Sequence, residues 1–269
     1  MKILRVACIQ NNAGKNTEGN LQFVRRALKE AVKRKVKLAA LPEMFYWRGP
    51  SDEMDGIARK VSPSVLREMR DFARRNKISI LLGSLLEPAA GKKYYNASYL
   101  ISEKGTLAAH YRKIHLFDID LKQLSLKESE KIARGNQIVS GSVWGISSGL
   151  SVCYDLRFPE LYRKLSQSGA KILFVPANFT YTTGQAHWET LLRARAIENQ
   201  AFVIAPGQCG THPTTKVRSY GNSLIIDPWG KILMRGSTSR QELIVADLHL
   251  DAQEELREAF PVLKHRRLA

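Results

Sequence analysis

The sequence is poor in cysteine, with 3 Cys among 269 residues. Three thiols cannot build the disulfide framework that holds small secreted domains together, so a disulfide scaffold is excluded. No apolar run approaches the ~18–20 uninterrupted residues that a membrane span needs. The apolar stretch at 1–10 is interrupted by Arg5 and Gln10 and is too short for a secretory signal. We therefore expect a cytoplasmic protein with reduced thiols and no membrane partner.

The sequence also lacks internal repeats and any linker rich in proline, glycine or serine. Hydrophobic residues make up 44% of the chain and charged residues 25%, which is ordinary for a globular protein. This composition excludes disorder, collagen and coiled coil as descriptions of the whole chain. We expect a single domain over residues 1–269, because α/β folds commonly exceed 200 residues.

Acidic residues are scarce relative to basic ones. Lys+Arg number 42 against 25 Asp+Glu, which gives a formal charge of +17. Such a surplus raises the hypothesis of a nucleic-acid-binding protein. The basic pairs, such as Arg25-Arg26 and Arg74-Arg75, are spread along the chain, and no zinc-finger, RNP or OB-like pattern accompanies them. We therefore predict no nucleic-acid partner and attribute the surplus to solvent-exposed faces.

Apolar periodicity indicates alternating helices and strands. Between 20 and 35, Leu21, Val24 and Leu28 recur at helical spacing, and Lys and Arg occupy the opposite face. This alternation is typical of an α/β fold, to which late hairpin-like strands add antiparallel pairing. We expect helices at 20–35, 64–76, 158–169 and 184–199. We expect strands at 1–10, 36–41, 78–82, 96–102, 106–111, 150–153, 171–175, 201–205, 222–226, 231–234 and 242–247.

Three reactive side chains follow predicted strands, where α/β folds place their chemistry. Glu43 follows the run at 36–41, Lys113 follows the strand that ends at Tyr111, and Cys153 ends the strand at 150–153. A thiol is mostly protonated at neutral pH, so a carboxylate that takes its proton would activate it. An ammonium would stabilise both the thiolate and the charge on a substrate carbonyl oxygen.

Simpler explanations exist for each of these residues. A cysteine after an apolar strand is usually an inert buried hydrophobe, and Cys8 and Cys209 are interpreted in that way. Glu43 could begin a helix and Lys113 could be solvated, and spacing alone does not show that the three meet. A histidine-based metal hydrolase is disfavoured, because no histidines form a tight ligand pair. The sequons at 96–98 and 178–180 have no meaning in a cytoplasmic chain.

Three local motifs occur in order along the chain, namely LPEMF at 41–45, YRKIHLFD at 111–118 and VCYDLRFPE at 152–160. Together they resemble the nitrilase, or carbon–nitrogen hydrolase, superfamily. The resemblance continues to 261–267 and so covers essentially the whole chain. It implies a four-layer αββα sandwich, a homodimer or higher homo-oligomer with the tail from about 250 at the dimer interface, and neither a cofactor nor a metal.

The resemblance also implies roles for residues. Glu43 is expected as general base, Cys153 as nucleophile and Lys113 as oxyanion stabiliser and proton donor. Glu128 matches a second glutamate that many members carry. The backbone N–H of Tyr154 is expected to share the oxyanion. Further candidates for substrate contact are Arg157, Tyr46, Phe179 and Thr183, although Arg157 could instead pair with Asp155 or Glu160.

Details at 207–212 and 219–223 resemble the Nit branch, whose small amidases act on α-keto acid amides. The expected substrate is a small anionic linear amide, hydrolysed through a cysteine thioester with release of ammonia. Deaminated glutathione is the first choice, and α-ketoglutaramate or α-ketosuccinamate is the alternative, as is another amidase or carbamoylase activity of the superfamily. The segment 131–136 departs from the Met-Pro-Gly-like turn of the family, which puts substrate preference in doubt.

Overall fold

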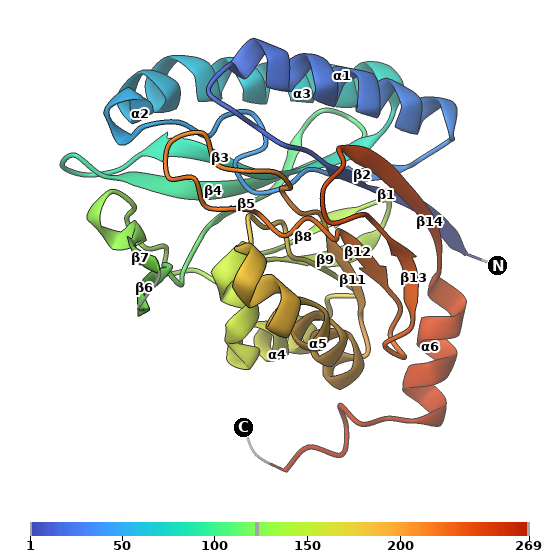
Figure 1. The fold of residues 1–269 in the computed structure, drawn as a ribbon. Coiled ribbons are helices and arrows are strands. Elements are labelled where there is room, and N and C mark those ends of the chain that lie inside the picture. Colours follow the sequence, from blue (N-terminus) through green and yellow to red (C-terminus); the bar gives the residue numbers. More distant parts are fainter. Residues whose placement is uncertain (1, 122–123, 268–269) are drawn as a thin grey trace.

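Two six-stranded sheets lie face to face in the computed structural model, with helices on both outer sides (Figure 1). The structure describes residues 2–121 and 124–267. The layers follow one another as helices, sheet, sheet and helices, which confirms the predicted αββα sandwich. Within the described residues, no helix combines the length and the apolar character needed to cross a bilayer.

The first sheet has the strand order β14-β1-β2-β3-β4-β5. Its strands β1, β2 and β3 are parallel, and the other neighbours pair antiparallel. The bounds are β1 Ile3–Gln10, β2 Leu38–Ala40, β3 Ser79–Pro88, β4 Tyr94–Ile101, β5 Leu107–Arg112 and β14 Glu242–His249. Its outer face is covered by α1 Thr17–Lys33 and α3 Ser62–Asn76, and between them lie η1 Ser51–Glu53, α2 Met54–Gly56 and η2 Ile57–Val61.

The second sheet has the order β13-β12-β11-β10-β9-β8, with β9, β10 and β11 parallel. The bounds are β8 Ser140–Val143, β9 Ile146–Leu150, β10 Ile172–Phe174, β11 Phe202–Ala205, β12 Leu224–Ile226 and β13 Ile232–Arg235. The helices α4 Pro159–Gln167 and α5 Tyr181–Asn199 cover its outer face (Figure 1). The chain continues from β14 into α6 Leu250–Ala259, which lies near the C-terminal end of the fold.

Both faces of the central strands are buried, which explains their continuous apolar runs. In β2, Leu38 and Ala40 face the cluster between the sheets, whereas Ala39 faces the cluster under α1 and α3. Helix α1 begins where Asn16 caps it by accepting a hydrogen bond from the Gly19 N–H. Two apolar clusters therefore fix the sheets, and the ends of the strands are held in place for the loops that follow them.

The sequence placed the helices and central strands within a few residues of their observed positions. It predicted a strand up to Cys153, but β9 ends at Leu150 and Cys153 begins the short helical turn η4 Cys153–Arg157. It missed α6, β8, and the hairpin of β6 Asp118–Leu121 and β7 Leu124–Lys127. These short or charged segments carry weak periodic signals, because their positions depend on contacts with the rest of the fold.

The hairpin of β6 and β7 leads into η3 Glu128–Glu130, which carries the second glutamate. The segment 131–136 that follows departs from the family pattern, yet it is tied to the first sheet. The Ala133 N–H donates to the Tyr94 carbonyl at 2.8 Å, and the Gly135 N–H donates to the Lys113 carbonyl at 2.7 Å. A Cβ on Gly135 would lie 2.1 Å from the Arg112 oxygen, so the close approach requires glycine.

Candidate active site

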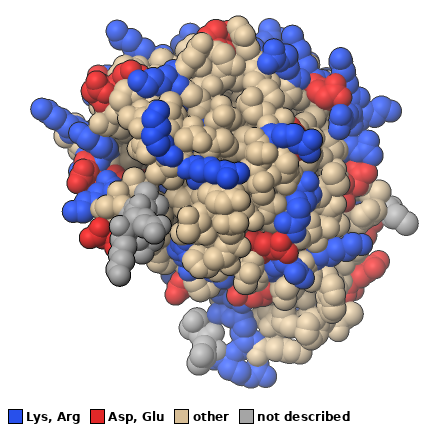
Figure 2. Space-filling model, in the orientation of Figure 1, with Lys and Arg blue, Asp and Glu red and all other residues tan. Residues whose placement is uncertain are grey.

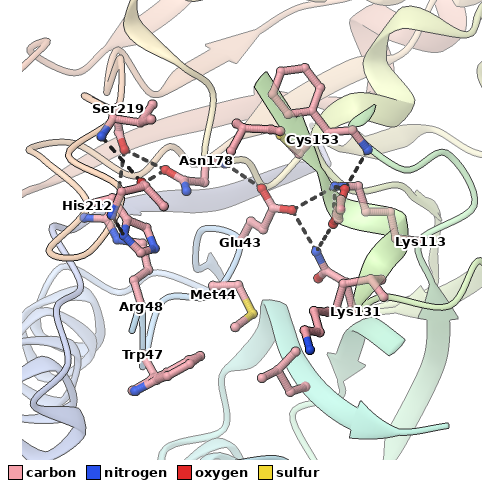
Figure 3. Close-up of a pocket in the computed structure, with 18 of the residues that line it drawn as sticks. Glu43, Met44, Trp47, Arg48, Lys113, Lys131, Cys153, Asn178, His212 and Ser219 are labelled. Carbon is pink, nitrogen blue, oxygen red and sulfur yellow. Dashed lines mark hydrogen bonds and ion pairs between the residues drawn. The ribbon is translucent and has the colours of Figure 1, made fainter. Parts of the chain in front are cut away.

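Strand ends from both sheets bring Glu43, Lys113 and Cys153 into one buried cluster (Figure 3). Glu43 follows β2, Lys113 directly follows β5, and Cys153 follows β9. The side chains of Glu43 and Lys113 are only 7% and 2% exposed. Sequence spacing could not show this convergence, because the two sheets must first stack before the loops meet.

Three different groups donate hydrogen bonds to the Glu43 carboxylate. Its Oε1 accepts hydrogen bonds from the Asn96 amide at 2.8 Å and from Lys113 Nζ at 3.1 Å. Its Oε2 accepts from the backbone N–H of Asn178 at 2.8 Å. The Cys153 thiol lies close enough to this carboxylate for the Glu43 charge to raise the pKa of the thiol. Glu43 is thus oriented toward the thiol by groups that favour its ionised form.

Lys113 lies between two glutamates. Its Nζ is 2.8 and 2.9 Å from the two Glu128 oxygens and 3.1 Å from Glu43 Oε1. Glu128 also accepts a hydrogen bond from the Phe117 N–H at 2.7 Å, which fixes the carboxylate on the loop after β5. The structure therefore brings Glu128 to the same cluster as the other three residues, whereas the nearby Glu130 does not line the pocket.

The thiol of Cys153 projects from a strained turn. Its φ is +50°, a left-handed conformation that is uncommon for residues other than glycine. The Cys153 N–H donates to the Pro176 carbonyl at 2.9 Å, which ties the turn to the loop after β10. Tyr154 is the second residue of η4 and lies in its first turn, where backbone N–H groups have no partner within the helix.

Asp155 holds this turn in place through its side chain, which is fully buried. Its carboxylate accepts hydrogen bonds from the Val152 N–H at 2.8 Å and the Tyr111 hydroxyl at 2.7 Å. It also accepts from the His115 N–H at 3.0 Å and lies 2.7 Å from His115 Nδ1. Asp155 therefore joins the turn that carries Cys153 to the strand end that carries Lys113.

The environment determines the charge of each group. Burial opposes ionisation of Glu43, but the Lys113 ammonium and the surrounding hydrogen bonds outweigh it and hold the pKa of Glu43 below its ordinary value. Burial also opposes the charge on Lys113, but Glu128 and Glu43 raise its pKa well above the ordinary value. Burial and the Glu43 charge raise the pKa of Cys153 well above its ordinary value, despite Lys113. The resting cluster is therefore a thiol, a carboxylate and an ammonium.

Two hollows meet at Cys153. The larger is a cavity of about 360 Å³ whose walls include Glu43, Lys113, Cys153 and Arg48. The smaller is about 20 Å³ and is lined by Tyr154, Arg157, Phe179 and Thr183 among others. Cys153 belongs to both walls. A substrate whose carbonyl carbon lies at the thiol can therefore extend into either hollow.

The predicted substrate-contact residues divide between the pocket and the core. Arg157 pairs with neither Asp155 nor Glu160; its guanidinium lies 3.2 Å from His187 Nδ1 and over the rings of Tyr154 and Phe179. Thr183 shares the smaller hollow with these residues.

Tyr46 does not fit its predicted place. Its side chain is fully buried, and its hydroxyl lies 2.8 Å from Ser62 Oγ and accepts from the Leu86 N–H at 3.1 Å. Tyr46 lines neither hollow. The expected contact between Tyr46 and substrate is corrected, because the chain after Glu43 turns this ring into the core under α1 and α3.

Several residues of the site were missed from the sequence. Asn96 and Asn178, which bind Glu43, stood in the two sequons that were set aside as meaningless. Asn178 follows the predicted strand at 171–175 and could have been found as a polar residue at a strand end. Arg48 and Asp155 gave no local signal, because their importance comes from contacts with distant loops.

The remaining candidate groups lie elsewhere. Cys8 and Cys209 are buried free thiols, and burial raises the pKa of Cys209 to about 11. Among residues 2–121 and 124–267, no group of three or more His, Cys, Asp or Glu side chains could hold a metal ion. Cys153 is thus distinguished from the other thiols by a carboxylate and an ammonium beside it.

Comparisons with known proteins agree with this architecture. The carbon-nitrogen hydrolase family model matches residues 5–258. Deaminated glutathione amidase of Dictyostelium discoideum is 37% identical over 279 residues, covering 99% of this chain and 95% of that protein. The crystal structure of the Caenorhabditis elegans NitFhit protein is similar, with 36% identity and a TM-score of 0.93. It covers 98% of this chain, which spans 65% of that longer one.

An amidase of the nitrilase superfamily from Nesterenkonia AN1 is also similar, with 26% identity, a TM-score of 0.82 and coverage of 98% of this chain and 94% of that one. A structure of a glutamate-to-glutamine mutant of that amidase shows covalent addition of the acetamide moiety of fluoroacetamide at its active-site cysteine. Together these similarities define a hydrolase that acts on carbon–nitrogen bonds. The chain belongs to the carbon-nitrogen hydrolase family, and the predicted similarity to Nit-type amidases is confirmed.

Proposed function

We propose that this protein is an amidase that hydrolyses a linear amide of a small anionic substrate through a thioester on Cys153. The observation that carries the proposal is that a buried carboxylate, Glu43, binds the Lys113 ammonium and lines the same cavity as the Cys153 thiol, whose pKa its charge raises. The covalent adduct on the active-site cysteine of the Nesterenkonia amidase supports the same role for Cys153.

Acylation begins with proton transfer. The thiol is protonated at rest, and Glu43 accepts its proton as the sulfur attacks the amide carbon. Lys113 and the Tyr154 N–H stabilise the oxyanion of the tetrahedral intermediate, and each such donor contributes about 10²–10³ in rate. The amine then leaves with a proton, and the acyl group remains on sulfur.

Deacylation uses the same carboxylate. Glu43 takes a proton from water, and the resulting hydroxide attacks the thioester carbonyl. The thiolate leaves and regains a proton, which restores the resting cluster. Glu128 keeps the Lys113 ammonium in position through both steps by its two short contacts. No metal or cofactor takes part in this scheme.

Polar side chains near Cys153 suit an anionic substrate. Arg157 and Thr183 line the smaller hollow, where a cation and a hydroxyl match a carboxylate or an α-keto acid group. A relative that is 37% identical bears the name deaminated glutathione amidase, so deaminated glutathione is the proposed substrate. The alternative is an ω-amidase that acts on α-ketoglutaramate or α-ketosuccinamate, or another amidase or carbamoylase of the superfamily.

The choice of substrate decides the leaving group. A primary amide such as α-ketoglutaramate releases ammonia. Deaminated glutathione carries a substituted amide, so its hydrolysis releases the amine of cysteinylglycine. The expectation of ammonia release therefore holds only for the alternative substrates, and an assay of deaminated glutathione must detect the amine.

A homodimer is part of the proposal. Trp229, Phe260 and Ile197 are exposed by 67%, 52% and 49%. Trp229 packs against Phe260 with ring centroids 6.4 Å apart, and Gly230 lies against Ile197. This apolar patch adjoins the tail from about 250, of which residues 268–269 lie outside the described chain. We further propose a cytoplasmic location, without a nucleic-acid or membrane partner.

The direct test of the substrate compares deaminated glutathione, α-ketoglutaramate and a simple nitrile. Product is measured as α-keto acid, with the amine or ammonia quantified in parallel. We expect the highest kcat/KM for deaminated glutathione and no turnover of the nitrile. Preference for α-ketoglutaramate would select the ω-amidase, and turnover of the nitrile alone would overturn the amidase assignment.

A further inference from the structure

Arg48 is buried in the wall of the larger hollow, where it is only 3% exposed. Its guanidinium donates five hydrogen bonds, one for each of its N–H groups. All five acceptors are neutral, and they come from distant parts of the chain. They are the carbonyls of Ala13 and Cys209, the side-chain oxygens of Asn12 and Asn178, and the hydroxyl of Ser219.

A buried cation is costly, and proteins normally give it an acidic partner. Burial lowers the pKa of Arg48 to about 10, so the group is still charged at neutral pH. No neutral side chain carries five N–H groups in a rigid fork, which explains why a charged one stands here. Its hydrogen bonds join the loops after β1 and β2 of the first sheet to the loops after β10 and β11 of the second. Arg48 therefore ties the two sheets together where the candidate active site lies.

The guanidinium also determines the direction of the hydrogen bonds beyond it. Because Arg48 can only donate, Ser219 Oγ accepts from its Nη1 at 2.8 Å and donates its own proton to Asn178 Oδ1 at 2.6 Å. The same Oδ1 accepts directly from Arg48 Nη1 at 3.2 Å. Two donors thus hold the side chain of Asn178, and Arg48 orients one of them. In Figure 3 these contacts form a line that leads to Glu43.

Asn178 connects this line to the carboxylate of Glu43. Its backbone N–H donates to Glu43 Oε2 at 2.8 Å. Glu43 Oε1 accepts from Asn96 and from Lys113, which occupies both of its lone pairs. Oε2 accepts one hydrogen bond from the described residues and so retains a lone pair for a further proton. The oxygen that Asn178 holds is therefore the one that is available as a base.

We propose that Arg48 positions the general base, Glu43, by fixing Asn178. In the acylation step the S–H bond of Cys153 breaks, an O–H bond forms at Glu43 Oε2, and the electron pair on sulfur attacks the amide carbon. The Asn178 N–H keeps Oε2 in place for this transfer and favours its ionised form. The inference rests on the proposed function, because it assigns a support to the base of that reaction.

The acid limbs of two pH profiles test the inference. The first is kcat/KM for deaminated glutathione, and the second is the rate at which iodoacetamide alkylates Cys153, which requires no hydrolysis. Both fall when Glu43 becomes protonated. Arg48→Met keeps an unbranched apolar stem and removes all five donors. We expect both acid limbs to move up by about 0.5–1 pH unit, because a loosened Asn178 N–H stabilises the carboxylate less.

The titratable neighbours of Glu43 come from three other elements. Lys113 follows β5, Cys153 begins η4, and Glu128 begins η3 and contacts Lys113. The pKa values of Lys113 and Cys153 lie well above their ordinary values, so neither group titrates on the acid limb. All three groups are retained in the variants. A difference in the limb between wild type and variant therefore reports on the surroundings of Glu43.

Ser219→Ala removes only the relay, and it tests the inference even if Arg48→Met does not fold. We expect an upward shift that is smaller than in Arg48→Met, because Asn178 keeps its direct bond to Arg48. The double variant should shift by less than the sum of the two single shifts, since both changes act through Asn178.

Arg163→Met is the matched control. Arg163 is half-buried on α4, and its guanidinium donates to the neutral carbonyl of Glu198 at 2.6 Å. It lines neither of the hollows that meet at Cys153. Thermal unfolding of every variant measures the change in stability. Arg163→Met should lose stability and leave both acid limbs where they are in the wild type.

The possible results are distinguishable. An unchanged limb in a folded Arg48→Met, or in Ser219→Ala where Arg48→Met does not fold, would overturn the inference. Shifts that add fully in the double variant, or an equal shift in Arg163→Met, would overturn it as well. Failure of the wild type to hydrolyse any of the proposed amides would overturn the proposed function, whereas the alkylation profiles would still decide whether Arg48 acts on Glu43.

Discussion

The Lys113 ammonium lies between two carboxylates, so its charge is balanced before any substrate arrives. A lone buried ammonium would tend to lose its proton, whereas two glutamates raise the pKa of Lys113 well above its ordinary value. Glu43, which follows β2, and Glu128, which follows the hairpin of β6 and β7, thus hold the ammonium of Lys113 beside the thiol. This arrangement is preorganised, since no group must move to meet an oxyanion.

The pH profile follows from the charge of Glu43. The pKa of Glu43 is held below the ordinary value of 4.5. The carboxylate therefore stays ionised as the pH falls and becomes protonated only below pH 4.5. The pKa values of Cys153 and Lys113 lie well above 9.0 and 10.5, so neither titrates near neutrality. We expect kcat/KM to be flat between about pH 5 and 9 with an acid limb below 4.5.

A pH series in buffers of constant ionic strength measures this profile. The control is thermal unfolding at each pH, which separates loss of the fold from loss of the base. An acid limb centred near pH 6–7 with an intact fold would contradict the account, because it would indicate a histidine or a raised carboxyl pKa in the rate-limiting step.

At the residue scale, the sequence singled out three residues that the structure brings together, and it missed the residues that hydrogen-bond to them. Glu43, Lys113 and Cys153 were identified because they follow strands within recognisable motifs. Asn96 and Arg48 could not be identified from the sequence, because an amide or a guanidinium acquires its role only when distant loops approach it. Tyr46 was misplaced because the sequence does not show which way a side chain turns after a strand.

At the scale of elements, the turn η4 is the part of the fold that presents Cys153, the proposed nucleophile. Its strained residue, Cys153, is held by contacts on both sides, with Pro176 accepting from its N–H and Asp155 bonding the residue before it. Backbone strain of this kind persists only where surrounding structure fixes it. Asp155 is therefore a positioning residue, which acts on the chemistry through the turn.

Asp155→Asn tests this role. The substitution keeps the shape but places an amide N–H₂ among four donors, so at least one hydrogen bond is lost. We expect kcat to fall by about 10²-fold with little change in KM, because small displacements of a nucleophile cost that much. The rate of alkylation of Cys153 should fall in parallel.

Ser151→Ala is the matched control. Ser151 is buried two residues before Cys153 and bonds to Tyr162 and Phe174, so its loss costs stability without touching the turn. Both variants should lose about 1–3 kcal/mol of unfolding free energy. A fall in kcat and in alkylation rate that is equal in the two variants would show that Asp155 has only a structural role.

The elements themselves were largely predictable from sequence. Helices such as α1 and strands such as β10 have clear apolar periods, because one face or both faces are buried. The hairpin of β6 and β7 and the helix α6 were missed, since charged residues interrupt their patterns. Glu128 was nevertheless identified, because the resemblance to the family located it where periodicity could not.

At the scale of the whole molecule, the net charge of +17 is dispersed. On the face shown in Figure 2, Lys and Arg side chains are spread around the surface with acidic side chains between them, and no continuous basic stripe is visible. A field of this kind raises encounter rates with small anions. Arg48, Lys113, Lys127 and Lys131 line the larger hollow, so they are the basic residues at the wall of the candidate site.

Association of two molecules is predicted through the patch of Trp229, Phe260 and Ile197. Trp229→Glu places a charge in this patch, and since Trp229 is exposed by 67% the monomer fold should be unaffected. Sedimentation velocity should show a dimer of the 30.3 kDa chain for the wild type and a monomer for the variant. Leu107→Glu, at an exposed site on β5, is the control and should remain dimeric.

A monomeric wild type at micromolar concentration would contradict this assembly. So would an unchanged dimer in Trp229→Glu, which would locate the interface elsewhere. The patch is small for a stable dimer interface, so the tail from about 250 should contribute the remaining area.

The central claim is that Cys153 becomes acylated. Mass spectrometry of enzyme quenched during turnover of deaminated glutathione should find the acyl group on the peptide that contains Cys153, and the adduct should disappear when substrate is exhausted. Cys153→Ala should show no adduct and no turnover above background, because the covalent route is removed. Full turnover by Cys153→Ala, or an acyl group found on Cys8 or Cys209 instead, would contradict the account.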